Sequence, residues 1–470
     1  MKKNVITLFL ILLSSISFFA QTTQSPEEQA FLTAQGMYKD GLYKLAISQL
    51  TNFINTYPLS TRIPHARFLL GESYFHSGQY VRAIDKYKQL IAEDPAIQFR
   101  ESANYRLGVA NFRLKNYQEA ERIFKDFIST YHKSEFRAQA YYWLAESEYQ
   151  QNNTKDALRH YAEVYNYFPG SSLADYSLYS AGWIYEKEGQ PETSLKIYKK
   201  FIQQYPKSKL LATVHYRAGV SAFEIKDYEQ AIELLQQGIE KFPKHKLREQ
   251  GELWIAEAYF KLKKHDQAIR QYNNLIQSFP NSSYTDDAYY GKGWAYVKKG
   301  QFQNAIDAFR DIVEKRPKSP LVPEALFQIG KSYVEMNQTL EARQVFVELT
   351  DKFKNHDKAI AALYEIGSID FDIGQYFQAK SFFTRIYQTF PNSDLAADAA
   401  YMEGECYRSL KEYENAINSF EFVLQKYPGS SVAPFALYKV GWCQFNIKEF
   451  QSAISNYDKF LNKYPNHELY

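Results

Sequence analysis

The chain places a proline, or a substitute for it, every 37 residues without a change of register. Ten of the twelve positions are proline, and ten of the twelve follow a Tyr or Phe. A fixed period of roughly 20 to 50 residues is typical of stacked-repeat proteins. We therefore expect one repeat architecture whose function lies on an extended surface and not in a single pocket. The positions are Pro58, Pro95, His132, Pro169, Pro206, Pro243, Pro280, Pro317, Lys354, Pro391, Pro428 and Pro465.

The other columns of the repeat have helical spacing. In the second repeat, Gly71 and Tyr74 lie three residues apart, as do Tyr80 and Ala83, and Tyr87 follows four residues later. Steps of three and four predict two helices of about 14 residues in each repeat. The recurring Gly or Ala of the first helix and Ala of the second mark where paired helices must approach closely.

Glycine and asparagine recur at the expected turn between the two helices. Both residues tolerate the left-handed conformation that ends a helix, and lysine occupies the remaining five positions. The second helix should end at the Tyr-Pro step, because proline disfavours helix in the residue before it. A serine two residues after the proline position is well placed to cap or lead into the next helix. The turn positions with Gly or Asn are Gly41, Gly78, Asn152, Gly189, Gly300, Asn337 and Gly374, and the serines are Ser60, Ser134, Ser171, Ser208, Ser282, Ser319, Ser393 and Ser430.

These residues resemble the tetratricopeptide repeat family. Its order of Leu-Gly, Tyr, Ala, aromatic and Pro is matched by Leu70-Gly71, Tyr74, Ala83, Tyr87 and Pro95. The family's early tryptophan is absent, larger residues replace its second small alanine, and the period is 37 residues and not about 34. The longer repeats look like those of exported bacterial envelope proteins, such as the outer-membrane assembly lipoprotein and the cell-division coordinator associated with the Tol–Pal system.

The resemblance implies an all-α fold, an α-solenoid of twelve helix-turn-helix repeats that form a right-handed superhelix. Ser25-Pro26-Glu27-Glu28 is a good helix start and sets the first repeat at about residue 27. Tyr470 closes the twelfth repeat without a polar cap, so we expect either an exposed last helix or a longer natural chain. The predicted repeats are 27–63, 64–100, 101–137, 138–174, 175–211, 212–248, 249–285, 286–322, 323–359, 360–396, 397–433 and 434–470.

The first twenty residues have a different composition from the repeats. Met1-Lys2-Lys3 is positive, and Val5 to Phe19 is almost wholly apolar. This pattern predicts a signal peptide at 1–20 with cleavage between Ala20 and Gln21, followed by a short leader at 21–26. An uncleaved membrane anchor is the alternative. No cysteine lies near the segment, so we expect no lipid anchor. Export to the periplasm or the outer membrane of a Gram-negative bacterium follows.

Composition and motifs argue against an enzyme. The 56 basic and 53 acidic residues nearly balance, so nucleic acid is not an expected partner. The nine histidines show no metal-ligand spacing, and we expect no catalytic residue, cofactor or metal site. Gly291-Lys292-Gly293 lacks the spacing of a phosphate-binding loop and is interpreted as part of the glycine column. Cys406 and Cys443, 37 residues apart, are expected to be buried, unpaired small residues.

An aromatic column in the first helix is the best candidate for binding. It is aromatic in eleven of twelve repeats, and by the resemblance it faces the concave groove, although packing alone would also explain it. In three repeats a tryptophan follows four residues later, on the same helix face. We expect a non-enzymatic scaffold of the cell envelope that binds other envelope proteins or peptide segments, or alternatively a glycan or peptidoglycan binder that uses Tyr–Trp platforms. The candidate residues are Tyr105, Tyr142, Tyr179, Trp183, Tyr216, Tyr290, Trp294, Tyr438 and Trp442.

Overall fold

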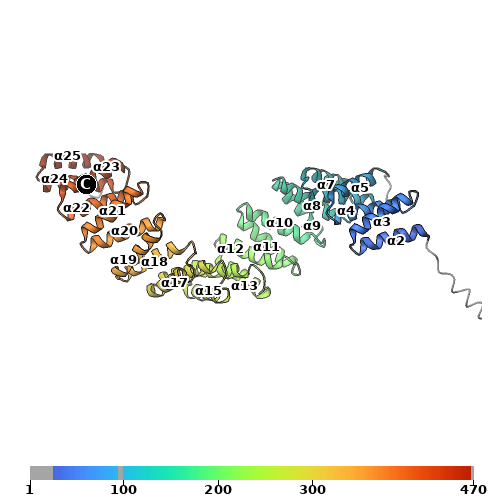
Figure 1. Ribbon diagram of the computed structural model, residues 1–470, viewed down its shortest axis with the longest axis horizontal. Coiled ribbons are helices and arrows are strands. Elements are labelled where there is room, and N and C mark those ends of the chain that lie inside the picture. The colour runs from blue at the N-terminus through green and yellow to red at the C-terminus, as the bar shows by residue number, and fades with distance from the viewer. Residues whose placement is uncertain (1–24, 94–98, 467–470) are drawn as a thin grey trace, which may run out of the picture. The chain divides into compact units, whose positions relative to one another are not determined.

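A computed structural model describes residues 25–93 and 99–466; the predicted signal peptide and its cleavage position lie outside the described residues. The described residues form 24 α-helices and no strand, which confirms the all-α prediction. Almost every helix has 14 residues, and the helices follow one another as pairs (Figure 1). The right-handed superhelical course stays a prediction.

The helix pairs are α2 (Pro26–Lys39) and α3 (Tyr43–Thr56), α4 (Ile63–His76) and α5 (Tyr80–Glu93), α6 (Arg100–Arg113) and α7 (Tyr117–Thr130), α8 (Arg137–Gln150) and α9 (Thr154–Tyr167), α10 (Ala174–Lys187) and α11 (Pro191–Gln204), α12 (Leu211–Glu224) and α13 (Tyr228–Lys241), α14 (Arg248–Lys261) and α15 (His265–Ser278), α16 (Thr285–Lys298) and α17 (Phe302–Lys315), α18 (Val322–Glu335) and α19 (Thr339–Lys352), α20 (Asp357–Asp372) and α21 (Tyr376–Thr389), α22 (Ala396–Ser409) and α23 (Tyr413–Lys426), and α24 (Ala433–Asn446) and α25 (Phe450–Lys463).

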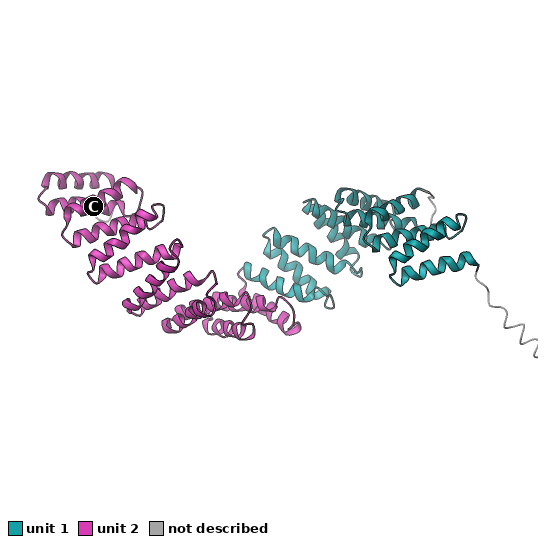
Figure 2. Ribbon diagram, viewed as in Figure 1, with its two compact units in different colours: residues 1–225 teal, residues 226–470 magenta. Residues whose placement is uncertain are grey.

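Two compact units divide the chain, residues 1–225 and residues 226–470 (Figure 2). Within each unit, every helix packs against the next one along the chain. First helices of adjacent repeats are also neighbours, as α2 is to α4 and α6 to α8 in the first unit, and α14 to α16 and α18 to α20 in the second. The first helices therefore share a surface across neighbouring repeats.

The glycine column is where the paired helices meet, as the sequence predicts. A Cβ added to Gly182 of α10 would stand 2.5 Å from the Tyr198 ring of α11, and one on Gly108 would stand 2.7 Å from the Phe124 ring. The rings of Tyr198 and Phe124 are fully buried. Glycine at these positions lets an aromatic ring of the second helix lie directly against the first-helix backbone.

All twelve turns between paired helices contain a residue with a left-handed backbone. Five are glycines, with φ from 69° to 79°, and the other seven are the two asparagines and five lysines, with φ from 56° to 66°. The glycines and asparagines are those expected for this conformation, and the lysines adopt it too. Second helices end as expected just before the proline position, as at Tyr57, which leaves the helical region at φ −123° and ψ 61°.

The serine after the proline leads into the next helix but is not its N-cap residue. The Ser60 hydroxyl accepts a hydrogen bond from the Arg62 backbone N–H at 3.1 Å, and α4 begins one residue later, so Arg62 is the N-cap. The same hydroxyl column also reaches back to an acid at the start of its own repeat. Ser208 donates to Asp175 at 2.6 Å, and Ser60 and Ser134 donate to Glu27 and Glu101. These bonds connect the two ends of a repeat.

The structure confirms the predicted helix start at Ser25 and the predicted burial of the two unpaired cysteines. Ser25 caps α2 by accepting a hydrogen bond from the Glu28 N–H at 3.1 Å, with Pro26 in the first turn. Cys406 and Cys443 are buried and unpaired, and burial raises the pKa of the thiols to about 12 and about 11. Helix α25 exposes three large apolar side chains, those of Phe450, Ile454 and Leu461.

Candidate binding surface

The aromatic column of the first helices is mainly a packing column. Tyr105 and Tyr216 are buried, and Tyr142, Tyr179, Tyr290 and Tyr438 are half-buried. The half-buried rings lie against second-helix rings, with ring centroids 5.9 Å apart for Tyr142–Tyr161, 6.4 Å for Tyr179–Tyr198, 5.5 Å for Tyr290–Phe309 and 5.6 Å for Tyr438–Tyr457. Each ring therefore keeps only one edge or face available to a ligand.

Of the three expected Tyr–Trp pairs, the structure brings one together. Tyr290 and Trp294 of α16 lie edge to face, with ring centroids 6.3 Å apart and planes at 82°. Trp183 and Trp442 instead lie against tyrosines of the preceding repeat, at 5.5 Å from Tyr149 and 5.8 Å from Tyr413. At Trp183 and Trp442 the two rings expected to form a platform on one helix therefore do not lie together. There the tryptophan ring lies against the preceding repeat, although its spacing from the tyrosine on its own helix is the same as at Tyr290–Trp294.

A basic side chain lies over each of the three tryptophan rings. The distances from the charged group to the ring centroid are 5.9 Å for Lys187 over Trp183, 5.9 Å for Lys298 over Trp294 and 5.5 Å for Arg408 over Trp442. These distances are within the range of cation–π attraction. The tryptophans of this surface thus already attract cations within the chain.

A cavity of about 360 Å³ opens beside the Tyr290–Trp294 pair. It lies within the second unit, and its walls come from α14, α15 and α16. It combines three aromatic side chains from the first helices with two carboxylates and one lysine. The lining residues are Glu257, Phe260, Tyr272, Asp287, Tyr290, Gly291, Trp294 and Lys298.

Gly291 lines this cavity and lets the tip of the Tyr272 ring lie directly against α16, and it was not among the candidates drawn from the sequence. A Cβ on Gly291 would stand 2.5 Å from both Cζ and Oη of Tyr272. At the same repeat position the other repeats carry a side chain, usually a long one: Leu32, Leu69, Arg106, Trp143, Ser180, Arg217, Trp254, Gln328, Glu365, Met402 and Lys439. The glycine column of the repeat is two residues further on, at Gly293, so Gly291 is not part of it. The sequence does show this difference, because Gly291 is the one glycine at a repeat position where the eleven other repeats have a side chain.

The two carboxylates of the cavity have few partners. Glu257 accepts a hydrogen bond of 2.5 Å from the Tyr272 hydroxyl. Asp287 is exposed at the edge, and no other described residue forms a hydrogen bond or ion pair with it. Partial burial, and then the nearby Asp286, raise the pKa of Asp287 above its ordinary value. Burial and the charge of Glu257 raise the pKa of the Tyr272 hydroxyl far above its ordinary value, so it stays a donor.

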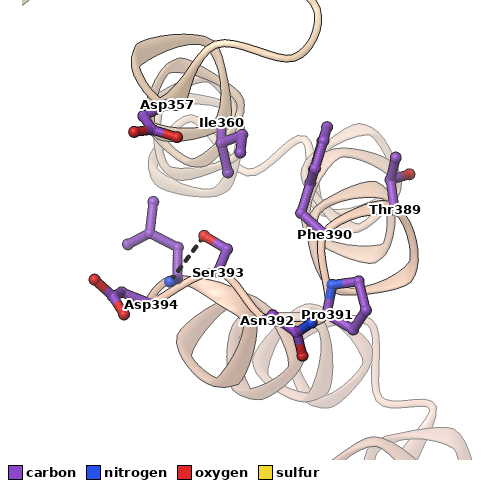
Figure 3. A pocket seen from close by; sticks show the side chains of 9 residues that line it. Asp357, Ile360, Thr389, Phe390, Pro391, Asn392, Ser393 and Asp394 are labelled. Atoms are coloured by element: carbon purple, nitrogen blue, oxygen red, sulfur yellow. Dashed lines mark hydrogen bonds between the residues drawn. The ribbon is translucent and has the colours of Figure 1, made fainter.

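A cavity of about 600 Å³ beside α20 is a feature of the repeat and not a special site. Figure 3 shows its lining, in which Asp357 and Ile360 of α20 face the link that runs from Thr389 to Leu395. A hollow of about 500 Å³ occurs at Glu27 and the link 56–61, where Thr56 and Thr389 lie nine repeats apart. Both follow from the Tyr-Pro link.

Over residues 25–93 and 99–466, no group of three or more His, Cys, Asp and Glu side chains is placed to hold a metal ion. Within the same residues, none of the helices has the length and apolar character needed to span a membrane.

Comparison with known proteins identifies the repeat. Profiles of the tetratricopeptide repeat match residues 33–96, 102–134, 361–393, 398–430 and 435–467. The profile of a family described as outer membrane lipoprotein matches residues 137–291 and 209–365. The chain belongs to the tetratricopeptide repeat proteins, and its central repeats are of the envelope lipoprotein type.

Solved structures with similar folds share little sequence with this chain. A tetratricopeptide repeat protein from Parabacteroides merdae is 16% identical over 57% of this chain and 98% of its own, with a TM-score of 0.37. The MamA protein is 24% identical over 39% of this chain and 94% of its own, with a TM-score of 0.34. The Naa15/Naa10 complex bound to HypK contributes a chain that is 15% identical over 92% of this chain and 68% of its own, with a TM-score of 0.38. Curated proteins give no match.

Proposed function

We propose that this protein is a non-enzymatic scaffold of the bacterial cell envelope that binds segments of partner proteins along its first helices. The observation that carries the proposal is the cavity between α14 and α16, where Tyr290, Trp294 and two carboxylates are accessible from one surface. Exposed aromatic rings next to charged groups are typical of protein recognition sites. Tetratricopeptide repeats suggest interaction with proteins.

The envelope location has two independent supports. The outer membrane lipoprotein profile covers the central repeats, and the first twenty residues have the pattern of a signal peptide. Cleavage between Ala20 and Gln21 would release a chain that begins at the leader 21–26. Mass spectrometry of the N-terminal peptide of protein purified from cell fractions tests this: we expect Gln21 as the first residue, in the periplasmic or outer-membrane fraction. Full-length chain in the cytoplasm would contradict the export proposal.

Site-specific crosslinking in intact cells tests the binding proposal. A photoreactive amino acid replaces Lys298, which lines the cavity, and in a matched control it replaces Arg270, which is exposed on the second helix α15. We expect adducts with envelope proteins from position 298 that are absent from position 270. Identical adducts from both positions, or none from position 298, would contradict partner binding at the first helices.

The glycan alternative receives less support from the ring geometry. A sugar stacks on an open aromatic face, but Tyr290 and Trp294 meet edge to face at 82°, and Lys298 lies over Trp294. Glycan binding stays a prediction with its own test. Under that alternative, purified protein should sediment with peptidoglycan, and the Trp183→Ala and Trp294→Ala variants should not.

A further inference from the structure

We infer that the cavity beside Glu257 binds the side chain of a lysine or arginine from the partner segment. The inference rests on the proposed function and specifies which part of a partner would enter this site. It comes from a charge pattern that recurs between neighbouring first helices and lacks its base at Glu146 and at Glu257.

The pattern joins a residue of one first helix to the residue 34 positions later, on the first helix of the next repeat. Glu72 pairs with Arg106 at 3.1 Å, and Glu405 pairs with Lys439 at 3.1 Å. Lys331 and Glu365 form the same pair with reversed charges, at 3.0 Å. At these positions each acid is neutralised by a base of the chain itself. At Glu257 the residue 34 positions later is Gly291.

The second repeat contains the complete form of the site. There the Tyr87 hydroxyl donates to Glu72 at 2.5 Å, and Arg106 lies on the same carboxylate. Tyr272 donates to Glu257 in the same way, five repeats later. Glycine replaces the arginine, and Gly291, Glu257 and Tyr272 all line the cavity of about 360 Å³.

One other acid at this repeat position faces no base, and its surroundings differ. Glu146 is followed 34 residues later by Ser180. It accepts a hydrogen bond of 2.6 Å from Tyr161 and also interacts with the hydroxyl of Tyr142. Leu253 stands where Tyr142 would stand next to Glu257. Glu257 therefore lacks both the base and the second hydroxyl donor.

The rest of the cavity also favours a positive ligand. Phe260 and Tyr290 supply ring faces and edges, and aromatic faces attract ammonium and guanidinium groups, while Lys298 already lies over the Trp294 ring. Asp287 adds a second carboxylate that has no partner among the described residues, and Lys298 is the only base in the lining. Two carboxylates against one lysine leave a net negative charge. An acidic side chain would be repelled, and a neutral one would leave Glu257 without a counter-charge.

Fluorine NMR on the full-length mature protein tests the inference directly. The tryptophans are replaced by 5-fluorotryptophan, and the Trp294 signal is assigned with a Trp294→Phe variant. The probes are three Gly/Ser-rich peptides that differ only in a central lysine, acetyl-lysine or norleucine. We expect the lysine peptide to shift the Trp294 signal at concentrations up to about 10 mM, in the range of weak single-side-chain binding. Equal shifts with all three peptides, or no shift with the lysine peptide, would overturn the inference.

Charge-removing variants of nearly unchanged shape make the test specific. Glu257→Gln and Asp287→Asn should each weaken binding of the lysine peptide about tenfold, because hydrogen bonds between charged groups are the strong ones. Glu365→Gln is the matched control, since Glu365 already pairs with Lys331, and it should leave binding unchanged. If all three variants weaken binding equally, general negative charge and not this cavity is responsible.

A gain-of-side-chain variant completes the set. Gly291→Arg places a cation 34 residues after Glu257, as Arg106 is placed after Glu72, and should abolish binding of the lysine peptide by supplying the missing cation, although the Tyr272 ring must shift to admit the new Cβ. Circular dichroism checks that the variant is folded, and Glu257→Gln keeps the test valid if it is not. Crosslinked partners without any lysine preference at this site would refute the inference and leave the proposed function standing. The absence of crosslinked partners would refute the proposed function itself.

Discussion

The hydroxyl of Tyr272 donates a hydrogen bond of 2.5 Å to the Glu257 carboxylate at the wall of the cavity. Removing the hydroxyl in Tyr272→Phe should destabilise the protein by about 1 kcal/mol, the usual net value of a hydrogen bond to a group that water can still reach. Phenylalanine occupies the same position in other repeats, so packing should be kept. Thermal unfolding measures the change. Glu257→Gln, which keeps an acceptor for Tyr272, should cost less, and a larger loss for Glu257→Gln would contradict this account.

Asp287 should make both stability and ligand binding depend on pH. Its pKa is raised by partial burial and by Asp286, whose own charge is paired with Arg316 at 2.5 Å. A raised pKa means that the folded state binds the proton more tightly than the unfolded state. The resulting stability is present at low pH and is lost as the pH rises through the folded-state pKa.

Asp287→Asn should therefore raise the melting temperature slightly at pH 7 and leave it unchanged below the ordinary aspartate pKa of about 3.9. Lysine-peptide binding should weaken as Asp287 is protonated. Glu257 and Lys298 are the other charged residues that line the cavity. Melting curves and peptide titrations at the two pH values provide the measurement. A lower melting temperature for Asp287→Asn at pH 7 would show that the carboxylate is stabilising.

Arg343 and Asp370 form the most buried ion pair between neighbouring helices of the second unit. Asp370 is fully buried, and Arg343 donates to its two oxygens at 2.7 and 3.1 Å. Arg343→Met leaves the carboxylate buried without a counter-charge and should cost about 3 kcal/mol. The double variant with Asp370→Asn should recover part of the loss. Arg122→Met, which removes an exposed pair with Glu119, is the control and should change stability by under about 1 kcal/mol.

Two glycines of the first unit should respond in opposite ways to alanine. Gly182→Ala places a Cβ 2.5 Å from the buried Tyr198 ring, and overpacking of this kind costs about 1 to 3 kcal/mol. Gly36 lies inside α2 with nothing within 4 Å of an added Cβ. Gly36→Ala should therefore stabilise the helix, by up to about 1 kcal/mol. Chemical denaturation of the two variants measures both signs, and equal effects would contradict the close-approach explanation.

Structural features that recur in every repeat could be predicted from the sequence, because the same physical requirement selects the same residue type twelve times. The helix pairs, the left-handed turns and the Gly182–Tyr198 contact all follow from such columns. Contacts between repeats were harder to predict. Trp183 contacts Tyr149 of the preceding repeat and not Tyr179 on its own helix, since its ring extends beyond its own helix. The spacing of residues within one repeat contains no information about that direction.

Only the aromatic residues of the candidate site were predicted from the sequence, and the reason is different. Tyr290 and Trp294 were candidates because they are large and conspicuous, and they do line the cavity. Gly291 and the carboxylates were not candidates, because the site depends on an absent side chain. Recognising it requires comparison of position 291 with Arg106 and Lys439, together with the ion pairs that those two residues form.

Repeats with the same backbone and the same packing columns present a general difficulty for a protein that binds extended segments. A segment lying along the first helices could shift by one repeat and find almost the same neighbours, so several alignments would have similar energy. The unneutralised Glu257 opposite Gly291 removes that degeneracy, because one basic residue of the segment has one best position. A single missing side chain would then determine the alignment of a bound segment along the second unit.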